Sequence, residues 1–147
     1  MIIQGVCGSF RKELTEGYHA FDSSYRAADT FKIALYSQSA SLDPSTTMVY
    51  TATGEVTGTG YSAGGIALVP TTPTQFNAYA YLSFANAVWT GVSFTANGAL
   101  IYNSTQGNRA VAILAFGGNK TPVNQVFTVQ FPVNGPTTSV LRFGPQG

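Results

Sequence analysis

The sequence predicts an all-β fold, an antiparallel sandwich of two sheets, preceded by a short amphipathic helix. From Phe31 onward, short apolar runs are separated by Gly-, Pro- and Asn-rich turns, at intervals typical of antiparallel sandwiches. Before that point the apolar residues recur with a helical period instead. We therefore divide the chain into an N-terminal arm with a linker, residues 1–30, and a single β-sandwich domain, residues 31–147.

One amphipathic helix is predicted within residues 8–21. The apolar residues that share one face, three or four positions apart, are Phe10, Leu14, Tyr18 and Phe21. The residues expected on the opposite, solvated face are Arg11, Lys12, Glu13 and Glu16. Ser9 is a suitable N-cap. An isolated helix of this length is marginal in water, so it must pack on something. That surface is either its own β domain or a neighbouring molecule, and the sequence leaves both open.

The β region contains the remaining elements. Strands are expected at Phe31–Tyr36, Met48–Tyr50, Ile66–Val69, Phe76–Phe84, Val88–Thr95, Ala99–Tyr102, Arg109–Phe116, Val126–Val133 and Ser139–Phe143. Asn97-Gly98 predicts a tight turn, because this dipeptide favours hairpins. Arg109–Phe116 is nearly all apolar, which predicts a central strand buried on both faces. Eight strands in two sheets are typical of a jelly-roll. An immunoglobulin-like sandwich stays open, because periodicity does not distinguish the two.

Charge is scarce and unevenly placed. Charged residues make up 9% of the chain, against a usual value of about 25%. All six acidic residues lie at or before Glu55. General acid–base catalysis, glycoside hydrolysis and divalent-metal binding mostly rely on carboxylates, His or Cys. We therefore expect no enzyme, no cofactor and no metal site. A surface with so little charge repulsion instead favours self-association.

Several other classes are disfavoured. The net charge is +1 and the basic residues are scattered, which argues against a nucleic-acid partner. No run of 18 apolar residues predicts a membrane span, and the first residues do not resemble a signal peptide. The single cysteine, Cys7, has no partner for an internal disulfide. These features favour synthesis in a reducing cytoplasm.

Four features invite a chemical interpretation, and each has a simpler one. Gly58–Ala63 matches the dinucleotide pattern G-x-G-x-x-[G/A], yet a strand ending at Pro70 follows it instead of the required helix. His19 lacks an arranged nucleophile, so we expect a surface or interface histidine. Cys7 is expected to be a small buried or contact residue rather than a reactive thiol. A glycan-stacking platform is conceivable, but core packing is favoured. Its residues would be Tyr61, Tyr79, Tyr81, Trp89 and Tyr102.

The order of several blocks resembles small virion structural proteins of tailed bacteriophages. The blocks are Phe10–Leu14, Phe31–Tyr36, Gly54–Gly65, Trp89, Gly98–Asn103 and Ala112–Lys120. The resemblance extends from about Gly5 to Arg142, and the order of the blocks is more specific than any single one. Within that group we favour a capsid cement, or decoration, protein.

This resemblance implies a jelly-roll on the outer surface of the capsid, synthesised in the cytoplasm of a bacterial host. Its partners would be the major capsid protein and further copies of itself, with a trimer favoured over a dimer. Such a protein bridges capsid subunits and stabilises the DNA-filled head. The residues expected to contact the capsid or another subunit are Phe10, Arg11, Lys12, Leu14, Tyr18 and Phe21.

Two alternatives remain from other classes. The chain is either a neck, tail or fibre component that binds a receptor glycan through aromatic strands, or a virion-borne hydrolase. Truncation of Trp89 or Tyr81 would abolish glycan binding in the first case. The lack of carboxylates after Glu55 argues against the second.

Overall fold

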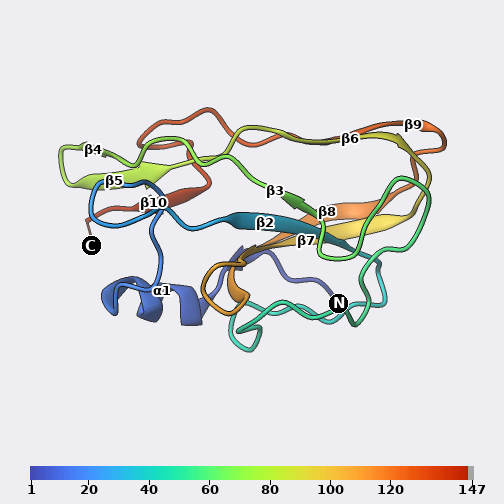
Figure 1. The fold of residues 1–147 in the computed structure, drawn as a ribbon, viewed down its shortest axis with the longest axis horizontal. Helices are drawn as coiled ribbons and strands as arrows, with labels where there is room; N and C mark the ends of the chain where they lie inside the picture. The colour runs from blue at the N-terminus through green and yellow to red at the C-terminus, as the bar shows by residue number, and fades with distance from the viewer. Residues whose placement is uncertain (146–147) are drawn as a thin grey trace.

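The computed structural model describes residues 1–145, and most of the regular structure in them is β-strand. All pairings between the named strands are antiparallel. The predicted all-β, antiparallel fold is thereby confirmed. Two layers of strands face each other, and the single helix with the loops around residues 40–55 lies beneath one of them (Figure 1).

The first layer is a five-stranded sheet. Its strands, in spatial order, are β1 (Gly5–Val6), β8 (Arg109–Lys120), β7 (Ala96–Asn103), β2 (Phe31–Tyr36) and β3 (Ile66–Ala67). The pairs Ile33–Ile101 and Leu100–Ile113 align apolar side chains across three neighbouring strands. All four are almost completely buried, as expected for a sheet covered on both faces. The predicted strand Phe31–Tyr36 matches β2 residue for residue.

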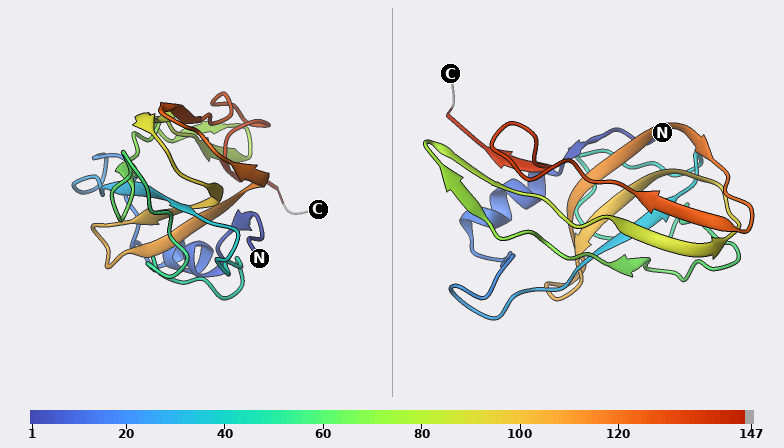
Figure 2. Two further views of the ribbon diagram at one scale, coloured as in Figure 1. Left: turned by 90° about the vertical axis from the view of Figure 1, so that its right-hand side faces the viewer. Right: turned by 90° about the horizontal axis from the view of Figure 1, so that it is seen from above.

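The opposite layer consists of two smaller sheets placed end to end. One has the order β10 (Leu141–Phe143), β5 (Tyr79–Leu82), β4 (Thr74–Phe76), and the other pairs β6 (Ala87–Val92) with β9 (Gln125–Val129). β6 and β9 lie over the five-stranded sheet, with β9 on the side of β8 (Figure 2). Alternation in β6 points Ala87 and Trp89 into the core and Val88 outward.

The helix α1 (Gly8–Thr15) is shorter than the sequence predicts. It ends before Gly17, whose φ of +80° is a left-handed conformation typical of a residue that follows a helix. Cys7 occupies the N-cap position, and the hydroxyl of Ser9 has no hydrogen-bond partner among the described residues. The expected Ser9 cap is therefore wrong.

The N-terminal residues share one core with the rest of the chain. β1 pairs with β8, and the Met1 amine donates a hydrogen bond to the Ala40 carbonyl at 2.8 Å. Cys7 and Phe10 are completely buried. Of the two packing surfaces that the sequence left open, α1 therefore uses its own β domain.

Two strand assignments differ because of local backbone geometry. The predicted strand Phe76–Phe84 is a hairpin of β4 and β5, since Asn77 takes a positive φ of 54° at the turn. Asn97-Gly98 is not a turn but part of β7, where Gly98 pairs with both Tyr36 and Ala115. A Cβ atom at Gly98 would lie 2.5 Å from the Leu114 carbonyl oxygen. Glycine is required there for close strand packing.

Other strands differ mainly in extent. β8 runs four residues beyond its predicted end at Phe116, to Lys120, and only its first half is buried on both faces. β9 and β10 are shorter than predicted. Met48–Tyr50 forms no strand and contributes one bridge, from Val49 to Arg109.

Candidate functional site

The predicted contact residues do not form one surface. Phe10 is completely buried, with its ring centroid 4.7 Å from that of His19. Phe21 stacks on Phe31 at 4.3 Å and is largely covered. Phe10 cannot contact a partner in this fold, so its assignment to an intermolecular surface is wrong. The helical period that suggested a docking face instead marks the face that packs against the chain's own sheet.

The remaining predicted contacts are partly or fully accessible. Leu14 is half-buried, whereas Arg11 and Lys12 are exposed. Lys12 pairs with Glu16 at 2.9 Å along the exposed side of the helix. The Arg109 guanidinium lies 4.0 Å above the ring of Tyr18, a cation–π contact that ties the segment after α1 to β8.

A buried polar cluster joins the N-terminal segment to β7, and His19 is at its centre. The Asn103 side-chain oxygen accepts hydrogen bonds from the backbone N–H groups of Thr105 and Gln106. This fixes the amide orientation, so its nitrogen donates to His19 Nδ1 at 3.0 Å. His19 Nε2 must then carry the proton, and it donates to Glu13 Oε2 at 2.7 Å. The imidazole is therefore neutral and held at both nitrogens.

Asp29 is the most completely satisfied carboxylate in the described chain. Its oxygens accept hydrogen bonds from Arg26, Gln106, Asn103 and the backbone N–H of Ala20. Burial alone would raise its pKa, but these donors, Arg26 foremost, hold the pKa well below its usual range. Burial lowers the pKa of His19, although the neighbouring carboxylates oppose that change. The cluster therefore stabilises the charged form of the Asp29 carboxylate and the neutral form of the His19 imidazole.

This cluster corrects two expectations. His19 is not at the surface, since its side chain is completely buried, and Glu13 is buried beside it rather than on the solvated face of the helix. Arg109 approaches Glu13 at 3.3 Å and supplies the opposite charge. The cluster could not be predicted from local pattern, because Asp29 and Asn103 are brought together only by the pairing of β2 with β7.

A further carboxylate, Glu55, joins loops beside β2, where it forms a bridge with Tyr36. It accepts hydrogen bonds from the hydroxyls of Tyr50 and Tyr61, at 2.6 and 2.7 Å, and from the Gly64 N–H at 2.7 Å. Burial, with Glu55 nearby, raises the pKa of both tyrosines. Both tyrosine hydroxyls donate their protons to Glu55, so the arrangement has a structural role.

The motifs with a chemical interpretation have structural environments. Residues 58–65 form turns that lead into β3 rather than into a helix, so the Gly58–Ala63 segment lacks the helix N-terminus that would hold a pyrophosphate. Burial, with Glu13 nearby, raises the pKa of the Cys7 thiol to about 11, which keeps it protonated. Among residues 1–145, no three His, Cys, Asp or Glu side chains gather as metal ligands.

The aromatic residues mostly belong to the core. Trp89 is 4% exposed and Tyr102 is 3% exposed, so neither presents a face to a sugar. Trp89 packs against Tyr61 and Phe127, with ring centroids 6.4 and 6.0 Å away. The favoured core interpretation of these rings is correct for Trp89 and Tyr102.

The layer opposite the five-stranded sheet has few charged residues. The strands of the layer formed by β4, β5, β6, β9 and β10 contain one charged residue, Arg142. The outward side chains of this layer include Phe76, Val88 and Val126, which are about half exposed or more. The described ion pairs all involve residues of the N-terminal segment or β8. We call the outward face of β6 and β9, two strands that contain no charged residue, the uncharged face.

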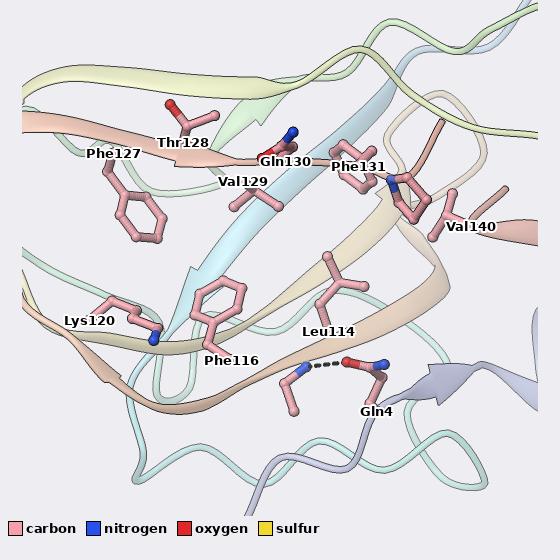
Figure 3. Close-up of a pocket in the computed structure, with 12 residues that line it drawn as sticks. Gln4, Leu114, Phe116, Lys120, Phe127, Thr128, Val129, Gln130, Phe131 and Val140 are labelled. Carbon is pink, nitrogen blue, oxygen red and sulfur yellow. Dashed lines mark hydrogen bonds between the residues drawn. The ribbon is translucent and has the colours of Figure 1, made fainter. Parts of the chain in front are cut away.

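A groove opens between β8 and β9, at one side of the molecule (Figure 3). Its volume is about 550 Å³. The apolar side chains that point into it include Leu114, Phe116, Phe127 and Val129. Lys120 is its one charged lining residue, and Gln4 lies at the β8 side. The lining favours an apolar, extended occupant rather than a charged small molecule.

Comparisons with known proteins identify no relative: no family model, no curated protein and no solved structure matches this chain. Within residues 1–145 the one helix is too short to cross a bilayer.

Proposed function

We propose that this chain is a non-enzymatic structural protein of a bacteriophage virion, a cement protein on the outer surface of the capsid. The observation that carries the proposal is the outward face of β6 and β9, which contains no charged residue and exposes apolar side chains such as Val88 and Val126. Such a face has a low desolvation cost on association and is not repelled by further copies of itself.

The mechanism is bridging of neighbouring capsid subunits, and the uncharged face is the attachment surface. The apolar side of α1 packs against the chain's own core. The helix is therefore not a docking arm for the capsid. Each copy contributes a modest interface, and linkage of copies into a homo-oligomer makes detachment slow through avidity. In this role the two layers would form a jelly-roll sandwich that resists outward pressure on the head.

The first test is the copy number per virion, measured by quantitative mass spectrometry of purified particles. A cement protein is expected at a copy number comparable to that of the major capsid protein. A few copies per particle would place the chain in the neck, tail or fibres, and absence from the particle would refute both roles.

The second test concerns the attachment surface. Val88→Lys adds a charge to the uncharged face, and it should abolish binding to heads that lack the protein. Val49→Lys is a matched control, because Val49 is 50% exposed and Val88 47%, but Val49 lies beside the five-stranded sheet. Binding of the natural protein should survive about 0.5 M salt, since few exposed charges contribute to it. Equal binding by both variants would contradict this surface.

A further inference from the structure

β9 has an edge that the chain does not protect. Within residues 1–145, one edge of β9 pairs with β6 and no strand pairs with the other. β1, β3, β4 and β10 have only two or three residues, and β1 covers part of β8. The outer edge of β6 is flanked at both ends, by the Thr59–Ser93 bridge and by the bond from the Ala85 N–H to the Val69 carbonyl. The Gln4 side chain also accepts a hydrogen bond from the Ala115 N–H of β8, at 3.2 Å. β9 has five residues and neither a charge nor a proline to prevent pairing.

The groove beneath this edge is incompletely filled. Phe127 and Val129 of β9 point down into it, and Leu114 and Phe116 of β8 line its floor (Figure 3). Leu114, Phe116 and Phe127 remain partly accessible although they pack against the core. A strand added to the free edge of β9 would lie over the groove and bury these side chains.

We propose that the occupant is β9 of a second copy, paired antiparallel across a two-fold axis. An antiparallel pair of identical strands presents the same residues from both sides. With the axis near Phe127, Val126 of one copy faces Thr128 of the other, and two β-branched side chains suit such a pair. The paired β9 residues are uncharged, so no like charges face each other across the two strands.

This pairing deepens the self-association in the proposed function and makes a specific claim about it. In a two-fold antiparallel pair, each copy uses the same β9 edge, and no free β9 edge is left for a third copy. The unit is therefore a dimer and not the trimer that the resemblance implies. The paired strands join the two β6–β9 sheets into one four-stranded sheet, which extends the uncharged face across the dimer. The claim concerns the isolated protein, so it stands or falls independently of capsid binding.

The test compares two variants of the full chain, Thr128→Glu and Thr90→Glu. Both residues are exposed threonines of the same two-stranded sheet, but Thr128 is on β9, at the proposed interface, and Thr90 is on β6, away from it. Molar mass is measured by light scattering and by sedimentation equilibrium, with circular dichroism as a check of folding. The natural chain and Thr90→Glu should be dimers. Thr128→Glu should raise the dimer dissociation constant by roughly tenfold or more, through repulsion near the axis.

A mixture separates repulsion from misfolding. Thr128→Glu mixed with Thr128→Lys should form a heterodimer, detected by native mass spectrometry, because opposite charges then meet near the axis. A monomeric or trimeric natural chain would overturn the proposal, as would a Thr128→Glu variant that dimerises as well as Thr90→Glu. Failure of the mixture to restore a dimer would also overturn it. Capsid attachment by a monomer would leave capsid binding in place and remove this pairing, together with the self-association assumed in the proposed function.

Discussion

The two layers of this protein are stabilised in different ways. The five-stranded sheet and the N-terminal segment are joined by directional bonds between buried ionisable groups, with Asp29 and His19 as the central residues. The layer of β6 and β9 has one charged residue in all its strands and relies on packed aromatic rings such as Trp89 and Phe127. Directional bonds fix one arrangement, whereas apolar contacts tolerate a new partner.

This difference suggests a division of labour. In the N-terminal segment and the five-stranded sheet, the buried charged groups pair with one another, because a buried ion without partners is strongly destabilising. The uncharged face keeps apolar side chains in solvent, where they are available for association. Variants of these paired groups should therefore change stability, and variants on the uncharged face should change assembly.

The largest effect is expected from deletion of residues 1–21, which removes β1, α1, Phe10 and His19. The remaining chain would expose the surface that Phe10 covers and leave Asn103 without its histidine, so it should lose cooperative unfolding. Urea denaturation followed by fluorescence measures this. Tyr25→Ala is the control, because Tyr25 is 97% exposed and its loss should be neutral. A truncated chain that unfolds cooperatively would show that the segment is a separable arm.

Asp29→Ala should lower the free energy of unfolding by about 2–4 kcal/mol, because it leaves four donors without their acceptor. Asp22→Ala is the matched control in the same segment. The Asp22 carboxylate accepts one exposed bond, from the Ser24 N–H at 3.0 Å. Equal unfolding free energies for the two variants would mean that the polar cluster does not stabilise the segment.

Acid should destabilise the protein in two stages. The folded pKa of His19 lies below its unfolded value of 6.5, so the unfolded chain binds more protons and stability falls as the pH drops below about 6.5. The folded pKa of Asp29 also lies below its unfolded value of 3.8, so further stability is lost below about pH 4.

Denaturation midpoints measured from pH 7 to pH 3 test this behaviour. His19→Gln should remove the first stage and keep the second, at the cost of a lower stability at neutral pH. A first stage that persists in His19→Gln would show that His19 is not its source.

The smallest change in stability is expected on the uncharged face. Val88→Lys and Thr90→Glu should each alter the free energy of unfolding by less than about 0.5 kcal/mol, since both side chains point outward. Urea titration of both variants measures it. Losses as large as that of Asp29→Ala would mean that this face is needed for folding, and the division between the layers would be wrong.

Some elements were predictable from local pattern alone. β2 matches its predicted bounds, because a short, mostly apolar run bounded by polar residues is typical of a buried strand. The start of β8 and the helical period around Phe10 were equally visible. Gly98 was misleading, since its dipeptide favours a turn in isolation while the close approach of Leu114 requires a glycine inside the strand.

The sequence by itself determined the class of fold, the place of the helix and the uneven distribution of charge, because each depends on periodicity or on composition along the chain. Only the tertiary structure decided what the helix packs on, that His19 and Glu13 are buried together, and that β9 keeps a free edge above an apolar groove. These depend on which strands become neighbours. Asp29 and Asn103 meet across 74 positions of chain, a separation that no local pattern records.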